Sequence, residues 1–98
     1  MVYFLPVTWQ VGFSKKAAKR MKKLPENIQL RLARLVEEIR FSGPVRGNWK
    51  NYSKLGPDAH HCHIKSGQPT YVACWEVLDN KIRIVEVYYV GTHEEVRY

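Results

Sequence analysis

The stretch Thr70–Glu95, TYVACWEVLDNKIRIVEVYYVGTHEE, decides the fold. Two runs rich in β-branched and aromatic residues flank Asp79 and Asn80, a pair typical of a hairpin turn. Just upstream, HHCHIK has the period of a strand and is followed by the turn SGQP. We therefore expect three consecutive strands joined as an antiparallel meander. The residues expected in its core are Trp75, Val77, Ile82 and Ile84.

One strand and two helices are expected ahead of this meander. TWQVGFS has period two, which predicts a strand, and Ser14 at its end can cap a helix. KKAAKRMKKL is helix-prone and basic, Pro25 breaks it, and Gly43 ends the next helix. That second helix carries an apolar stripe made by Ile28, Leu32, Leu35, Val36 and Ile39. The polar segment 50–59 is expected to be a loop or the ragged start of a strand.

These elements predict one α+β domain over residues 1–98. Its N-terminal strand and two-helix hairpin are expected to pack on an antiparallel sheet. At 98 residues the chain has room for one modest core. The helices would cover one face of the sheet, which leaves the opposite face free to bind a partner.

The charge and composition point to a polyanionic partner. The formal net charge is +7, from 16 Lys and Arg against 9 Asp and Glu. So basic a chain favours nucleic acid, an acidic protein or an anionic membrane surface. The opening MVYFLPV lacks the basic region of a signal peptide, and no run approaches the ~20 apolar residues of a bilayer span. Two cysteines, Cys62 and Cys74, are too few for a disulfide scaffold. We expect a soluble cytoplasmic protein with no membrane partner.

The histidines are the candidates for chemistry. Strand alternation places His61 and His63 on one face, and His93 follows the last strand, where it could converge with them. Cleavage of RNA at a phosphodiester needs a base for the 2′-OH, cations for the phosphorane-like charge and an acid for the 5′ oxygen. No metal is required, because the 2′-OH is an internal nucleophile. The cations expected around the histidines are Lys50, Lys54, Lys65, Arg83 and Arg97.

Plainer interpretations stand beside this one. A strand histidine more often satisfies a hydrogen bond or lies at the surface than it catalyses a reaction, and His60 is assigned to these non-catalytic histidines. Zinc is not expected, since Cys62 and His63 face opposite ways and no C-x-x-C pair is present, and no cofactor is expected either. Trp49 is expected to be a packing anchor. Four aromatics could stack on bases if exposed: Tyr52, Tyr71, Trp75 and Tyr98. Composition and spacing alone lead no further than a basic α+β domain with nucleic acid as a candidate partner.

Three short motifs carry a resemblance to a known family. They are Pro-x-x-Gly-x-Trp-Lys-x-Tyr from Pro44 to Tyr52, Cys-His-Ile from Cys62 to Ile64, and Gly-Thr-His from Gly91 to His93. With the basic helix before them, they make the chain similar to the RelE/ParE toxin superfamily from about Thr8 to Tyr98. The branch with the strongest resemblance is that of the YafQ-type ribonuclease toxins.

The resemblance implies a microbial-RNase-like fold and a toxin of a type II toxin-antitoxin system. Such toxins cut mRNA in the ribosomal A site by 2′-OH attack and are held inactive by a cognate antitoxin. The implied partners are therefore the ribosome, mRNA and an antitoxin protein, in a hetero-oligomer with the toxin. The matching residues are His63 and His93, with His93 as the general acid. Tyr98 falls close to a C-terminal aromatic that orients a base.

The chain departs from the family pattern at three positions. Gly43 stands where YafQ-type members have a His, Thr70 where they have an Asp, and Val72 where many RelE members have an Arg. We infer that His61 could supply the missing base, and Lys65 or Arg83 the missing cation. The departures also leave open a different class of function: a ParE-like toxin that inhibits gyrase, or an inactive binder on the same fold.

Overall fold

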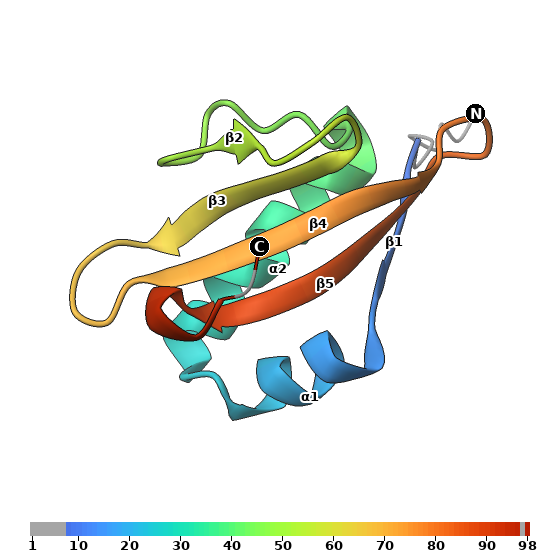
Figure 1. Ribbon diagram of the computed structural model, residues 1–98. Coiled ribbons are helices and arrows are strands. Elements are labelled where there is room, and N and C mark those ends of the chain that lie inside the picture. The colour runs from blue at the N-terminus through green and yellow to red at the C-terminus, as the bar shows by residue number, and fades with distance from the viewer. Residues whose placement is uncertain (1–7, 97) are drawn as a thin grey trace, which may run out of the picture.

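The structure is a computed structural model, and it describes residues 8–96 and Tyr98. Two helices and a five-stranded sheet form the α+β architecture that the sequence predicts (Figure 1). The elements are β1 (Gln10–Phe13), α1 (Lys15–Lys23), α2 (Glu26–Ser42), β2 (Ser53–Lys54), β3 (Ala59–Lys65), β4 (Tyr71–Asp79), β5 (Ile84–Thr92) and the 3₁₀ turn η1 (His93–Glu95). Within this described part, no helix is long and apolar enough to cross a membrane.

The sheet has the order β1-β5-β4-β3-β2 and is mixed. The meander β3-β4-β5 is antiparallel as predicted, but β1 pairs with β5 in parallel, with Val11 opposite Val85. The sequence predicts the antiparallel part of the sheet and assigns no partner to the N-terminal strand, which the structure adds as a parallel edge strand. Period two shows which faces of a strand are buried, but not which neighbour it pairs with or in which direction. A fifth strand, β2, lies in the segment expected to be a loop or a ragged strand start, and it pairs with β3.

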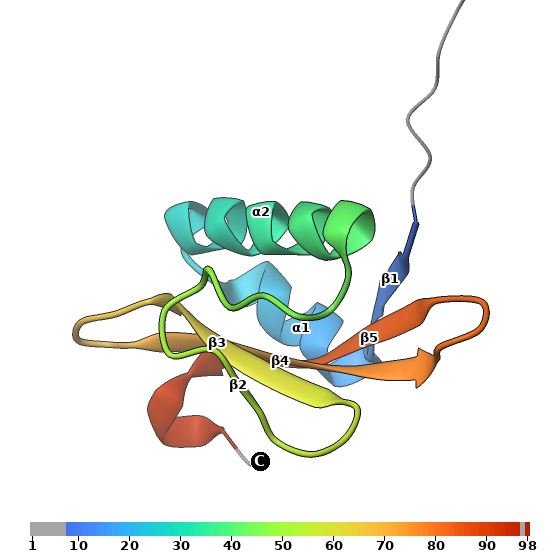
Figure 2. The same cartoon turned by 90° about the horizontal axis from the view of Figure 1, so that it is seen from above.

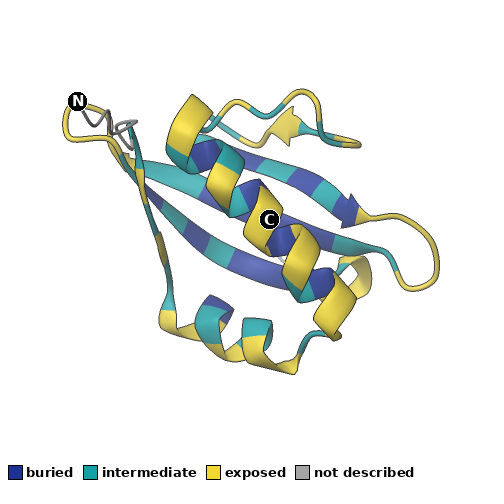
Figure 3. Cartoon of the chain, turned by 180° about the vertical axis from the view of Figure 1, so that it is seen from behind, coloured by how far each residue is buried: buried dark blue, intermediate teal, exposed yellow. Residues whose placement is uncertain are grey.

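The two helices cover one face of the sheet (Figure 2). Ser14 caps α1, since its side-chain oxygen accepts a hydrogen bond from the Ala17 N–H at 3.1 Å. Helix α2 begins after Pro25 and turns its apolar stripe to the sheet, so that exposed residues line its outer side (Figure 3). The fully buried members of that stripe are Ile28, Leu32, Leu35 and Ile39.

The core lies between α2 and the sheet, with the fully buried Trp75 as its largest member. The Trp75 indole N–H donates to the Pro44 carbonyl at 3.0 Å, which ties the chain after α2 to the sheet. The prediction that Ile82 is a core residue is wrong, because its side chain is 64% exposed. The Asp79 carboxylate accepts hydrogen bonds from the backbone N–H groups of Lys81 and Ile82. These residues therefore belong to the turn, and β5 begins only at Ile84.

The other sheet face carries a smaller apolar cluster of Val72, Cys74 and Tyr89, against which Val96 packs. The C-terminal segment therefore runs across this face, on the side opposite α2 (Figures 1 and 2). We call this side the open face. Both cysteines are free and buried, and burial raises the pKa of each thiol to about 12. They behave as small apolar side chains.

Candidate active site

Three histidines meet at one end of the open face. His61 and His63 project from β3, and His93 follows β5 at the first position of η1. The ring centroids of His63 and His93 lie 5.8 Å apart, and those of His61 and His63 lie 6.4 Å apart. The register explains the meeting, because His63 pairs with Val72 and Val72 pairs with Gly91, two residues before His93. The predicted convergence of these histidines is present in the structure.

His63 has surroundings that favour its neutral form. Its backbone N–H donates to the Lys50 carbonyl at 2.8 Å, and the Asn51 amide nitrogen lies 3.5 Å from its Nε2. Burial lowers the pKa of the imidazole, and the positive charges of His93, His61 and Lys50 lower it further. A neutral imidazole at neutral pH is ready to accept a proton.

His61 lies between His63 and the C-terminal aromatic. Its Nδ1 is 3.0 Å from the Ser53 hydroxyl oxygen, on the neighbouring strand β2. Its ring centroid is 5.1 Å from that of Tyr98, with the two ring planes at 75°. Tyr98 is 60% exposed, so one side of its ring is open to a ligand. The four rings are therefore neighbours in the order Tyr98, His61, His63 and His93.

His93 is exposed and is held by its backbone. Its N–H donates to the Thr70 carbonyl at 2.9 Å, which fixes the start of η1 beside β4. The Tyr89 hydroxyl donates to the Thr92 carbonyl at 2.7 Å. Arg20 of α1 forms an ion pair with Glu95 at 3.1 Å. These contacts come from α1, β5 and the residue that precedes β4, so the position of His93 depends on the whole end of the sheet.

The predicted cations divide into two groups. Lys50 and Lys65 lie beside His63, where all three line one pocket. Arg83 does not: it precedes β5 while His93 follows it, and the nine strand residues between them span roughly 30 Å. The prediction that Arg83 surrounds the histidines is therefore wrong. Lys54 pairs with His60 rather than with His61 or His63, and its charge acts on the buried His60. Arg97 lies outside the described residues.

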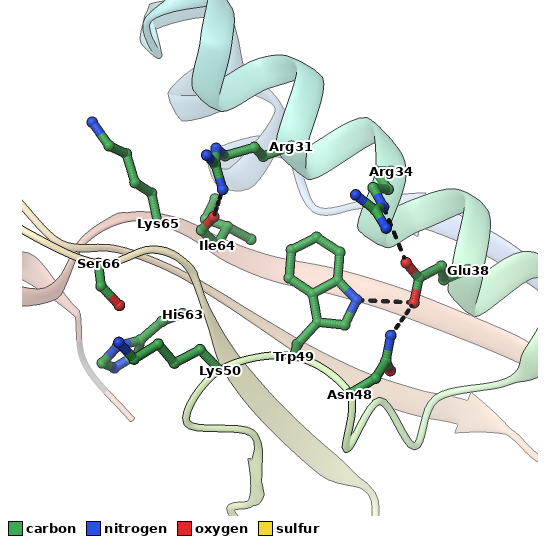
Figure 4. Close-up of a pocket in the computed structure, with 10 residues that line it drawn as sticks. All are labelled: Arg31, Arg34, Glu38, Asn48, Trp49, Lys50, His63, Ile64, Lys65 and Ser66. Atoms are coloured by element: carbon green, nitrogen blue, oxygen red, sulfur yellow. Dashed lines mark hydrogen bonds and ion pairs between the residues drawn. The ribbon is translucent and has the colours of Figure 1, made fainter.

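The pocket has a volume of about 440 Å³ and lies between α2 and the edge of the sheet at β3. Figure 4 shows Arg31 and Arg34 on the helix above it and Lys50, His63 and Lys65 on the opposite side. The sequence patterns did not single out Arg31 or Arg34. Their only signal was an exposed position on a helix whose opposite side is apolar, which is ordinary for a surface helix.

The remaining aromatics have structural roles. The His60 ring stacks on Trp75 at 5.8 Å and is 2.7 Å from the Tyr52 hydroxyl through Nδ1, which confirms the assignment of His60. Burial lowers the pKa of His60. Trp75 is fully buried and is no platform for a base, while Tyr52 and Tyr71 are half-buried against the core. Trp49 anchors its loop as predicted, because its indole N–H donates to the Glu38 carboxylate at 2.9 Å.

The three departures from the family pattern have local explanations. Gly43 ends α2 at a φ of 95°, and a Cβ there would lie 3.2 Å from the Trp9 indole nitrogen, so a histidine does not fit. The Thr70 hydroxyl donates to the Gly67 carbonyl and shapes the turn before β4. Val72 is fully buried beneath the site. No group of three His, Cys, Asp or Glu within residues 8–96 is placed to hold a metal ion.

Comparisons with known proteins identify the fold. No family model matches the sequence, and no curated protein matches it. Among solved structures, the isolated RelE toxin of E. coli matches at 25% identity with a TM-score of 0.67, over 91% of this chain and 88% of that one. The archaeal RelE-RelB complex from Pyrococcus horikoshii OT3 gives 13% identity and a TM-score of 0.69, over 91% and 99% of the two chains. The RelBE2 toxin-antitoxin complex from Mycobacterium tuberculosis gives 23% and 0.54, over 91% and 95%.

The chain therefore has the α+β fold of the RelE/ParE superfamily. Within that superfamily the matched structures are RelE toxins and their complexes, so the fold is that of RelE. They do not single out the YafQ-type branch.

Proposed function

We propose that this chain is the toxin of a type II toxin-antitoxin system and acts as a ribosome-dependent mRNA endoribonuclease. The RelE fold supports the toxin class. The observation that carries the chemistry is the pair of His63 and His93, whose ring centroids lie 5.8 Å apart on the open face. Two imidazoles close to one another and to lysines, one on β3 and one on η1, are the parts that RNA cleavage requires.

In the proposed reaction, neutral His63 takes the proton of the 2′-OH on the nucleotide before the cut. The 2′ oxygen attacks the adjacent phosphorus, and the bond from phosphorus to the 5′ oxygen breaks. Protonated His93 gives its proton to that leaving oxygen, which leaves a 2′,3′-cyclic phosphate and a 5′-OH. Lys50 stabilises the charge that develops on the phosphorane oxygens. His61 lies behind His63 as a second basic group, and Tyr98 offers its exposed ring to a base.

An antitoxin is the proposed protein partner. The matched structure from Pyrococcus horikoshii is a RelE-RelB complex and that from Mycobacterium tuberculosis is a toxin-antitoxin complex, which supports the same arrangement here. The charge of this chain also favours an acidic partner. Helix α1 contains no acidic residue, and its exposed side is basic through Lys15, Lys16, Lys19, Lys22 and Lys23.

A reconstituted translation reaction tests the proposed function. Wild-type protein, His93→Ala and Arg83→Ala are each added to translating ribosomes, and new mRNA ends are mapped by primer extension. Arg83→Ala is the matched control, because it removes a side chain at the opposite end of β5. We expect cuts at A-site codons with the wild type and with Arg83→Ala, and none with His93→Ala. If folded, antitoxin-free protein makes no cuts, the proposal fails and gyrase inhibition becomes the next function to test.

A further inference from the structure

The pocket between α2 and β3 is lined by two arginines, Arg31 and Arg34, that the proposed cleavage chemistry does not use. His63 lines this pocket and also faces His93, so the pocket begins at the proposed site of cleavage and leads away from it over the edge of the sheet. Its volume of about 440 Å³ is in the range of sites that hold small ligands, about 300–1,000 Å³. A group bound there would lie next to the scissile phosphate.

The charge of the pocket is strongly positive. Arg31 and Lys65 form no ion pair with any described residue, and Arg31 reaches across the pocket to the Ile64 carbonyl at 3.5 Å. The pocket has one carboxylate, Glu38, and that group is already engaged. It accepts hydrogen bonds from Trp49 at 2.9 Å and Asn48 at 2.8 Å. It also forms ion pairs with two arginines, Arg34 at 3.5 Å and Arg46 at 3.2 Å.

The state of Glu38 matters because a free carboxylate would repel an anion. Burial alone would raise its pKa, but the hydrogen bonds from Asn48, Trp49 and Arg46 outweigh burial and hold the pKa below its usual value. Glu38 therefore stays ionised and neutralised by its partners, and it leaves Arg31, Lys65 and Lys50 as the groups that face the pocket without a counter-charge among the described residues.

We propose that this pocket binds a backbone phosphate of the RNA next to the phosphate that is cleaved, with Arg31 and Lys65 as its principal contacts. The inference rests on the proposed function for the identity of the ligand. An arginine fork and a lysine on opposite walls match the geometry and charge of a phosphodiester. An acidic peptide fits the pocket less well than a phosphate does. Such a peptide also needs exposed apolar side chains to pack against, and the apolar residues of the pocket, Ile64 and Trp49, are both largely buried.

The test is the salt dependence of RNA binding. The probe is a fluorescent 2′-O-methyl RNA oligonucleotide, which cannot be cut because its 2′ oxygen is blocked, and binding is followed by anisotropy at several salt concentrations. We compare the wild type with Arg31→Ala/Lys65→Ala and with Lys81→Ala/Arg83→Ala, which removes the same charge at the far end of the sheet. All four side chains are exposed, so the variants should fold.

The pocket variant should bind at least about tenfold more weakly at low salt. Because each phosphate contact on single-stranded nucleic acid contributes about 0.7 to the slope of log K against log salt, its slope should fall by about that amount. The control should keep both values near those of the wild type. Equal affinity and slope for the pocket variant and the wild type would overturn the proposal. The proposal would also be overturned if the pocket variant bound RNA as well as the wild type does but lost the ability to bind a polyglutamate peptide.

The two proposals fail in different ways. If the wild type cuts mRNA on ribosomes but the pocket variant keeps its salt slope, the phosphate site is wrong and the ribonuclease function stands. If the wild type cuts nothing but the pocket variant loses affinity and slope, the ribonuclease function is wrong, and the pocket still binds a backbone phosphate of RNA.

Discussion

The ring of His63 on β3 lies 5.8 Å from the ring of His93 on η1, with the ring planes at 72°. Thirty positions separate the two residues in the chain, and the antiparallel register of β3, β4 and β5 brings them together. Val72 lies between their strands and is fully buried, so the pair stands above an apolar floor. This pair is the centre of the proposed site, and its surroundings lead to the following expectations.

Stability should fall as the solution is acidified through about pH 6.5. The pKa values of His60 and His63 are lowered from 6.5 in the folded protein, first by burial. The unfolded chain therefore binds more protons than the folded chain, so the free energy of unfolding falls as pH drops through 6.5 and levels off below the folded pKa values. Urea denaturation at pH 7.5 and 5.5 measures the change. His60→Gln should show a smaller drop than the wild type, and an identical drop in both would contradict this explanation.

Glu38→Ala should destabilise the fold by about 1–3 kcal/mol, the usual cost of leaving buried polar partners unpaired. Glu38 accepts from Trp49, Asn48 and Arg46, and these contacts hold the loop that leads to Lys50. The neighbouring Glu37→Ala is the matched control, because Glu37 pairs with Arg40 alone among the described residues, on the exposed side of α2. Chemical denaturation compares the two. Equal stability of both variants would show that Glu38 is no anchor.

Gly91→Ala should lower stability by about 1–3 kcal/mol through overpacking. A Cβ at Gly91 would lie 2.7 Å from the Tyr89 hydroxyl oxygen, which is itself fixed by its bond to Thr92. Gly47→Ala is the control, since a Cβ there meets no atom within 4 Å. In a Tyr89→Phe background the hydroxyl is gone, so the penalty at Gly91 should shrink. A thermal melt in which Gly91→Ala matches Gly47→Ala would refute the clash.

Much of the fold follows from local patterns in the sequence. The Ser14 cap, the break at Pro25 and the apolar stripe of α2 depend on neighbouring residues, and each is present. The parallel pairing of β1 with β5 depends on contacts between the two ends of the chain, and no local pattern encodes it. The exposure of Ile82 has another cause: the Asp79 side chain lengthens the turn, so Ile82 falls inside it despite its strand propensity.

The sequence likewise predicts some residues of the candidate site and not others. Alternation in β3 was enough to put His61 and His63 on one face, and the Gly-Thr-His motif pointed to His93. The position of Arg83 differs from the expectation because alternation shows only that Arg83 and His93 share a face, whereas the nine strand residues between them separate the two by roughly 30 Å. No sequence pattern indicates Arg31, because a basic residue on the exposed side of a helix is usually solvated. Only the fold shows that Arg31 lines a pocket together with residues of β3.

The most direct test of the account is single-turnover cleavage of mRNA on ribosomes by the wild type, His63→Gln, His93→Gln and the double variant. If the two rings act as one base and acid pair, each single change should slow cleavage by about 10²–10⁴-fold. The double variant should then be about as slow as the slower single variant, because groups that act as a unit are not additive. Cleavage at the wild-type rate by either single variant would contradict the central claim.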